Sequence, residues 1–380
     1  MTVYEPAKIE ERGDLIDFAN MVFSVAHRPH DFKKMLPKVY GDGAPLFFPE
    51  LHFIERTDGR VRALVAMLPV RMNIADEPLT AGFVGTVSVH PHHRGRGSMR
   101  ELMRMTIDEA RRRRFAYLAL GGQRQRYEYF GFSPAGLRAS HEIRPANIRH
   151  ALKDADASGI SFKTVGEADG GLIADIHAIY ETRPVRGARP PHMFHTICRS
   201  WGNELTAALS GGKCIGALIG DDREICELIL ADAKDAPRVI KAWFEYRKPD
   251  GAQLLVPMYD TAIQREIGAF SESVVYQEEV SICVLDWVST LEAYAALKHG
   301  AGAMTDGRWT FAVNDQPSIT IEVRGGRVDV AERSDAPSVR LSQIEAQRAI
   351  FSPMALAAPL PGAPVGWFPL PLGFGKPDQF

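Results

Sequence analysis

The chain has little cysteine, no long apolar run and almost no net charge, and each shortage removes a class of function. Its four cysteines lack C-x-x-C spacing, which predicts reduced thiols in a cytoplasmic protein and no structural zinc site (Cys198, Cys214, Cys226 and Cys283). No apolar run approaches the roughly 18 residues that a membrane-spanning helix needs, and the start, M-T-V-Y-E-P, predicts no secretory signal. The formal net charge of −2 argues against a general nucleic-acid or membrane binder.

Length and composition are those of a globular protein with more than one domain. The chain has 380 residues, and single domains usually have about 100–200, so two or three domains are expected. Apolar residues make up 45% and charged residues 24%, which is ordinary for a chain that buries several cores. Composition alone therefore leaves the function open, and local motifs have to supply it.

The most informative segment is residues 83–100, F-V-G-T-V-S-V-H-P-H-H-R-G-R-G-S-M-R. A β-rich run breaks at Pro91, and an Arg/Gly turn then opens directly into a helix. Glycines allow backbone N–H groups to face one centre, and the start of the helix adds unpaired donors and a positive dipole end. Arg94 and Arg96 add two full charges. The pattern predicts a site that binds a diphosphate.

Two common diphosphate motifs are excluded by single positions. A Walker loop ends in Gly-Lys-Ser/Thr, where this chain has Gly97-Ser98-Met99, and a dinucleotide fingerprint needs a third glycine where Arg100 stands. What remains resembles motif A of the GNAT superfamily of acyl-CoA N-acyltransferases, V-x-V-x-P-x-x-R-G-x-G followed by a helix. The matching residues are Val87, Val89, Pro91, Arg94, Gly95 and Gly97. Met99 departs from the Gly or Ala that is usual two residues after the last glycine.

This resemblance implies that acetyl-CoA is the co-substrate and that no metal takes part. The residues it assigns to acetyl-CoA binding are Val87, Ser88, Val89, Arg94, Gly95, Arg96, Gly97, Ser98 and Met99. Three nearby histidines could suggest a metal site, but one strand-to-turn segment can hardly aim all three at one ion (His90, His92 and His93). We therefore expect no metal centre.

The rest of the chain divides into two further parts. Residues 146–285 repeat the mixed strand-and-helix pattern of residues 1–145 without an R-G-x-G turn, and Val274 to Leu285 reads as one long strand. Residues 286–380 change character, with hairpin turns at 314–315 and 325–326, a helix capped by Ser342, and a proline- and aromatic-rich end. The apolar stretch from Trp367 to Phe374 predicts that this end docks onto the protein.

This layout resembles the enhanced-intracellular-survival (Eis) branch of the GNAT superfamily, and so does Y-E-Y-F-G-F at residues 127–132. The resemblance implies an α/β (α+β) fold class of tandem GNAT folds, each a mixed β-sheet flanked by helices. Residues 1–145 would be the catalytic domain, 146–285 a degenerate GNAT-like domain, and 286–380 a sterol-carrier-protein-like α+β domain that delivers the C-terminus. It also implies a homo-oligomer, most simply a hexamer.

The resemblance carries catalytic roles onto two residues. Tyr127 would donate a proton to the departing coenzyme A thiolate, and the α-carboxylate of Phe380 would serve as base for the attacking amine. A phenol near pKa 10 is a weaker acid than a thiol near 8.5, so donation is uphill by about 2 kcal/mol. The carboxylate must gain basicity by burial or act mainly by orienting the amine. The competing interpretations are that Tyr127 is an ordinary core aromatic and that Phe380 lies in a frayed end.

Two function classes remain open at this point. The first is an acetyl-CoA-dependent N-acetyltransferase acting on a primary amine of a small molecule or peptide, such as a lysine side chain, a polyamine or an aminosugar. The second is a non-enzymatic acyl-CoA or lipid-binding protein on the same scaffold. The sequence does not identify the amine, and it does not show which of the 47 acidic residues line the acceptor pocket.

Overall fold

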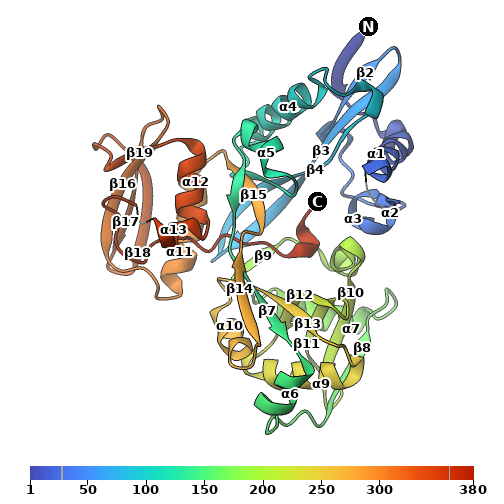
Figure 1. Ribbon diagram of the computed structural model, residues 1–380, viewed down its shortest axis with the longest axis vertical. Helices are drawn as coiled ribbons and strands as arrows, with labels where there is room; N and C mark the ends of the chain where they lie inside the picture. The colour runs from blue at the N-terminus through green and yellow to red at the C-terminus, as the bar shows by residue number, and fades with distance from the viewer. Residues whose placement is uncertain (27–28, 359) are drawn as a thin grey trace.

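Three β-sheets, each covered by helices, make up the part of the chain that the computed structural model describes: residues 1–26, 29–358 and 360–380 (Figure 1). The N-terminal lobe is drawn in blue and teal, the second lobe in green and yellow below it, and the third lobe in orange at the side. The end of the chain returns to the centre, where the lobes meet. The predicted mixed α/β fold class is confirmed. No helix among the described residues is both long enough and apolar enough to cross a membrane.

The first sheet has the strand order β1-β2-β3-β4-β5-β15-β6, with the short strand β9 added to one end of β3. Side chains alternate across β3: Ala63, Val65 and Met67 pack toward α4, whereas Leu64 and Leu68 pack toward α1. Both faces are therefore buried. The elements are β1 Thr2–Pro6, β2 His52–Thr57, β3 Arg60–Ile74, β4 Glu77–Val89, β5 Tyr117–Leu120, β6 Ser133–Ala135, β9 Val185–Gly187 and β15 Val280–Val284, with helices α1 Arg12–Ala26, α2 Phe32–Met35, α3 Pro37–Tyr40, α4 Ser98–Arg112 and α5 Arg124–Tyr127.

The second sheet has the order β14-β7-β13-β12-β11-β10-β8 and is also covered on both faces. Helices α6, α9 and α10 pack into one core, and α7 and α8 into another. The elements are β7 Arg138–Ile143, β8 Ile160–Thr164, β10 Glu204–Ser210, β11 Lys213–Gly220, β12 Glu224–Leu230, β13 Ala252–Pro257 and β14 Ser273–Gln277, with helices α6 Pro145–Ala151, α7 Gly170–Tyr180, α8 Phe194–Cys198, α9 Ala236–Arg247 and α10 Thr261–Gly268.

The two sheets exchange strands across the predicted boundaries, which the sequence did not indicate. The stretch expected to be one strand over Val274 to Leu285 is two strands, because the polar pair Glu278-Glu279 interrupts it. Strand β14 is largely exposed at the edge of the second sheet, whereas β15 is fully buried between β5 and β6 of the first. Strand β7, expected in the first domain, pairs with β13 and β14. The divisions at residues 145 and 285 therefore remain a prediction about domains.

The third lobe is a smaller sheet with the order β18-β17-β16-β19. Its predicted hairpin turns are confirmed, with positive φ at Asn314 and at the Gly325-Gly326 pair. The predicted capping box of Ser342 and Glu345 is confirmed as well. The likeness to sterol-carrier proteins remains a prediction. The elements are β16 Gly307–Val313, β17 Ser318–Arg324, β18 Arg327–Arg333 and β19 Val339–Leu341, with helices α11 Trp287–Gly300, α12 Gln343–Phe351 and α13 Met354–Ala357.

The C-terminal segment docks onto the protein, as its apolar composition predicted. Leu370, Leu372 and Phe374 are buried in the largest hydrophobic core. The ring of Phe374 lies 5.1 Å from that of Phe83 on β4, measured between centroids. This packing brings the last residues of the chain back to the first sheet.

Candidate active site

Strand β4 is distorted and partly unpaired where the sequence predicted an acyl-CoA site. Its pairing with β3 jumps from Gly85 opposite Ala66 to Ser88 opposite Leu64, so β4 carries an extra residue there. Thr86 has a φ of +47°, and the Ser88 hydroxyl donates to the Thr86 carbonyl oxygen at 2.9 Å. The parallel pairing of β4 with β5 ends at Phe83. Beyond that point no described strand covers the β5-facing edge of β4.

The Arg/Gly turn follows this open edge at once. Gly95 and Gly97 have φ values of +81° and +86°, and a Cβ on either would meet nothing within 4 Å, so backbone conformation rather than space requires glycine. Helix α4 begins at Ser98, and Arg94 and Arg96 are exposed beside its start. Val87, Val89 and Met99 are half-buried, and Ser88 and Ser98 are buried. All the predicted acetyl-CoA residues thus lie along one strand–turn–helix.

A buried contact between a histidine and a carboxylate lies next to the turn. His93 Nε2 lies 2.6 Å from Glu55 Oε1, and both side chains are almost fully buried. Burial acts to raise the pKa of the Glu55 carboxyl, but the neighbouring Ser98, His93 and Thr57 lower it overall. His93 is therefore engaged with a carboxylate of β2, and among the described residues no group of histidine, cysteine or acidic side chains is arranged to hold a metal ion.

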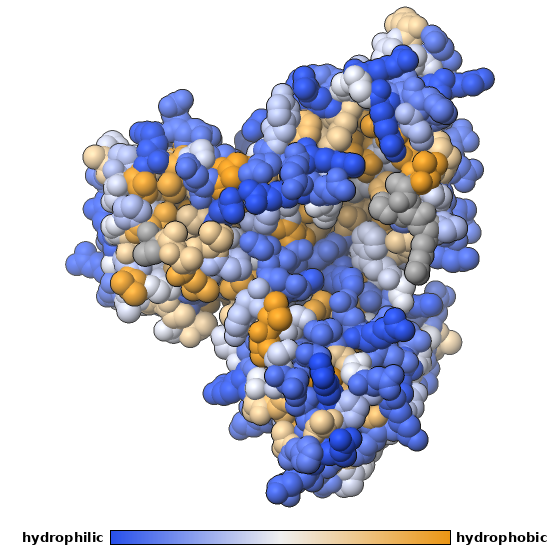
Figure 2. Space-filling model, viewed as in Figure 1, coloured by the Kyte–Doolittle hydropathy of each residue, from blue (hydrophilic) through white to orange (hydrophobic). Residues whose placement is uncertain are grey.

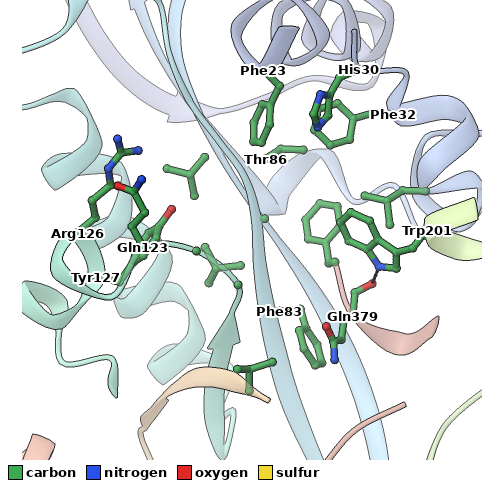
Figure 3. A pocket seen from close by; sticks show the side chains of 18 of the residues that line it. Phe23, His30, Phe32, Phe83, Thr86, Gln123, Arg126, Tyr127, Trp201 and Gln379 are labelled. Atoms are coloured by element: carbon green, nitrogen blue, oxygen red, sulfur yellow. Dashed lines mark hydrogen bonds between the residues drawn. The ribbon is translucent and has the colours of Figure 1, made fainter. Parts of the chain in front are cut away.

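A cavity of about 610 Å³ opens at the bulge of β4 and brings together residues that are far apart in the sequence. Figure 3 shows Gln123, Arg126 and Tyr127 on one side of β4 and an aromatic group on the other. We call this aromatic group the acceptor half of the cavity; it consists of Phe23, His30, Phe32 and Trp201. Other lining residues include Thr86, Val87, Arg94, Val280 and Phe380. Figure 2 shows a hollow between the upper and lower lobes, with mostly hydrophilic residues around it.

Tyr127 combines a packed ring with a hydroxyl that is available to a ligand. The residue is 8% exposed, its ring packs near Phe132, and it lines the cavity. A Cβ on Gly122 would come within 2.8 Å of this ring, so the close approach requires glycine there. In the described part of the chain nothing hydrogen-bonds the Tyr127 hydroxyl. Burial raises the pKa of Tyr127, and the nearby Arg126 opposes that rise.

Phe380 reaches the same cavity from the opposite end of the sequence. It is 7% exposed, and its ring centroid lies 5.9 Å from that of Tyr40. A Cβ built on Gly85 would lie 2.8 Å from the Phe380 ring and 3.1 Å from its carboxyl carbon. The end of the chain therefore packs directly against the bulge of β4. The interpretation of Phe380 as a frayed end is wrong.

Buried polar contacts hold these last residues in place. Arg189 Nε and Nη2 donate to the two carboxylate oxygens of Asp378 at 2.8 and 2.9 Å, and both side chains are buried. Lys38 Nζ donates to the Gln379 carbonyl oxygen at 2.6 Å, and the Trp201 indole N–H donates to the same oxygen at 3.3 Å. We call Lys38, Arg189 and Asp378 the tail latch. The latch joins the first two lobes to the end of the chain.

Sequence reasoning missed the acceptor half and the tail latch. Phe23 lies in α1 and Phe32 at the start of α2, where apolar residues are common, and Val280 reaches the cavity only because β15 joins the first sheet. No local motif marks such residues. One usable signal was Asp378, the acidic residue of a largely apolar end, since a buried carboxylate needs a basic partner.

Part of this site lies in a segment that is similar to a known family of domains. Residues 3–135, about a third of the chain, match the family model described as an acetyltransferase (GNAT) domain. No curated protein sequence matches the chain significantly.

Several solved structures share the fold of most or all of the chain. A GCN5-related N-acetyltransferase from Anabaena variabilis is similar over 100% of both chains, with a TM-score of 0.68 and 16% identity. A probable N-acyltransferase from Enterococcus faecalis gives a TM-score of 0.65 at 14% identity and covers 91% of this chain and 88% of its own. Eis1 from Mycobacterium abscessus gives 0.60 at 15% identity with the same coverage. At such identities the likeness shows the fold.

The domain match and the site geometry fall on the same residues. The match includes β4, the Arg/Gly turn, α4 and Tyr127, and so covers the open strand edge and the start of the helix. The open strand edge, the Arg/Gly turn and Tyr127 therefore all lie within the part of the chain that is similar to an acetyltransferase (GNAT) domain.

Proposed function

We propose that the protein transfers the acetyl group of acetyl-CoA to a primary amine of a small molecule or peptide. The observation that carries the proposal is that one cavity is lined by the open edge of β4, by Tyr127 and by Phe380 at the end of the chain. An amine and an acyl donor brought into this cavity from opposite sides of β4 would meet at its bulge.

The residues along β4 and the turn fit coenzyme A. The backbone of Val87, Ser88 and Val89 forms the edge of β4 that no described strand covers, and an extended pantetheine arm can bond to such an edge as an added strand would. The turn from Arg94 to Met99, including Gly95, Arg96, Gly97 and Ser98, offers N–H donors at the start of α4 and two exposed guanidinium groups for the diphosphate. No metal is needed for this binding.

Tyr127 is proposed as the general acid. Acetyl-CoA supplies an activated thioester, so transfer forms a C–N bond, breaks a C–S bond, takes a proton from the amine and returns one to sulfur. Burial raises the pKa of Tyr127, so its hydroxyl stays protonated until the C–S bond breaks and the leaving sulfur takes the proton. The same apolar surroundings disfavour both the thiolate and the phenolate, so the cost of proton donation stays at the roughly 2 kcal/mol that the pKa values in water imply. Positioned acids typically contribute a hundred- to ten-thousand-fold, on the order of 3–5 kcal/mol.

The C-terminal carboxylate of Phe380 is proposed to orient and deprotonate the amine. In water an α-carboxylate has a pKa of about 3.5 and an alkylammonium about 10.4, so full proton transfer would be steeply uphill. An ammonium loses hydration as it enters an aromatic cavity, and this loss lowers its pKa. We therefore assign the carboxylate mainly a hydrogen-bonding role toward the amine, with the proton leaving directly or through water.

Thiol release from acetyl-CoA in the presence of a panel of amines tests this function. Tyr127→Phe should lower turnover by about a hundredfold or more while acetyl-CoA affinity stays unchanged. Tyr129→Phe is the matched control, because Tyr129 is 69% exposed and does not line the cavity. Equal losses in both variants, or none in either, would contradict the assignment. The non-enzymatic alternative finds no support in this site.

A further inference from the structure

The acceptor half of the cavity is aromatic and carries no acidic side chain. The rings of Phe23, His30 and Phe32 form one group with centroid separations of 5.0–5.5 Å. Trp201 completes the wall beside Gln379 (Figure 3). Among the described residues that line the whole cavity, none is Asp or Glu.

Apart from the C-terminal carboxylate of Phe380, the charged groups among the described lining residues are positive. Arg94 and Arg126 lie toward the proposed coenzyme A side, and Lys376 lies near the end of the chain. Lys376 is paired with Glu224, and Asp378 is bound by Arg189, so these two nearby carboxylates are already engaged. A ligand with several ammonium groups would find no free side-chain carboxylate among the described residues that line this cavity.

The backbone of Trp201 is an independent sign that this wall is built for a ligand. Trp201 has φ +66° and ψ +20°, a left-handed conformation that side-chain-bearing residues rarely adopt. The hydrogen bond from its indole N–H to the Gln379 carbonyl oxygen fixes the ring at the end of the chain. Strained backbone of this kind persists where the surroundings hold it, and it gathers at binding sites.

We propose, building on the function proposed above, that the acceptor is a monoamine with a flat apolar body, such as an arylalkylamine. The body would lie between Phe32 and Trp201, and the amine would point toward Gly85 and the end of the chain. Aromatic faces stabilise one ammonium while it approaches. Each further ammonium of a polyamine or aminoglycoside would be buried without a carboxylate and repelled by the cationic lining.

The test compares four amines at matched concentrations: tryptamine and phenethylamine against spermidine and kanamycin A. Thiol release and mass spectrometry of the products give kcat/KM, and calorimetry gives acetyl-CoA affinity. We expect kcat/KM to be at least tenfold higher for the aromatic amines. Equal or faster transfer to spermidine or kanamycin A would overturn this inference and leave the proposed function standing. No transfer to either aromatic amine would overturn it too, and loss of acetyl-CoA binding as well would overturn the proposed function.

A substitution at Trp201 tests the wall itself. Trp201→Gly removes the ring, and glycine adopts the observed φ without strain, so the backbone should keep its path. We expect at least a tenfold lower kcat/KM for tryptamine, mainly through KM, with acetyl-CoA affinity unchanged. Trp201→Phe, which keeps an aromatic ring, should retain most of the kcat/KM for tryptamine that Trp201→Gly loses. Tyr246→Ala, which removes an exposed aromatic of the second lobe, is the control. Unchanged tryptamine kinetics in Trp201→Gly would overturn the proposed placement.

Discussion

Substitution of Asp378 should release the end of the chain without unfolding the protein. Asp378→Ala removes two charge-assisted hydrogen bonds from Arg189, whose side chain is fully buried. Such bonds contribute roughly 1.5–3 kcal/mol each. Arg189 keeps Glu227, whose carboxylate lies 2.9 Å away, so part of the loss is offset and we take about 3 kcal/mol as the net effect. At about 1.4 kcal/mol per factor of ten, undocking of the tail becomes about a hundredfold easier.

Carboxypeptidase digestion measures this opening without any assumption about catalysis. When opening and closing are fast, removal of Phe380 follows the population of the undocked tail. We expect digestion to be about a hundredfold faster in Asp378→Ala and less accelerated in Asp378→Asn, which keeps the shape and loses the charge. Turnover should fall more in Asp378→Ala than in Asp378→Asn, and acetyl-CoA affinity should stay unchanged in both.

Asp335→Ala is the matched control for the buried pair. Asp335 also pairs with an arginine, Arg308, but both side chains are about half exposed on the third lobe. Exposed ion pairs contribute at most about 1 kcal/mol, so digestion and turnover should both stay near those of the unmodified protein. If folded Asp378→Ala protein resisted carboxypeptidase as well as the unmodified protein, the latch would not hold the tail. If turnover stayed unchanged although the tail was undocked, the docked tail would have no role in catalysis.

Three further predictions concern coenzyme A binding and pH. Replacing both Arg94 and Arg96 by Ala should weaken acetyl-CoA binding at least tenfold in calorimetry, and unchanged affinity would remove the site from the turn. Because burial raises the pKa of Tyr127, and a general acid must be protonated, the loss of turnover at high pH should occur only as pH rises through that raised value; a high-pH loss well below the ordinary phenol pKa of about 10 would contradict its role. Burial also raises the pKa of Glu279 to about 7 from 4.5, so its contribution to stability is complete below pH 4.5 and lost as pH rises through 7. Glu279→Gln should therefore flatten the fall in Tm between pH 5 and 8, and an unchanged profile would exclude Glu279 as its source.

The coenzyme A half of the site could be predicted because it is local. A strand, a turn and the start of a helix follow one another within residues 83–100, and each step depends on neighbouring residues. The glycines at 95 and 97 could be interpreted from the sequence because the turn needs positive φ values, which few residues other than glycine adopt. Tyr127 follows the next strand, so it too could be placed from a nearby signature.

The acceptor half and the latch could not be predicted, because they depend on contacts between distant residues. Arg189 and Asp378 are 189 positions apart, and Trp201 reaches the carbonyl of Gln379 from another lobe. The strand exchange was hidden because the residues of β14 and β15 were predicted to form one long strand. Only the interruption at Glu278-Glu279 and the change from an exposed to a fully buried strand separate them.

The most direct test of the central claim compares two proteins that differ in one atom group. Ligation of synthetic C-terminal peptides yields the chain with either a free carboxylate or a carboxamide at Phe380. The amide keeps the shape and removes the charge, so acetyl-CoA affinity and resistance to unfolding should stay unchanged. We predict that turnover of the amide form falls by about a hundredfold or more, within the range of general-base catalysis. Equal turnover of the two forms would contradict the account and assign the proton transfer to another group.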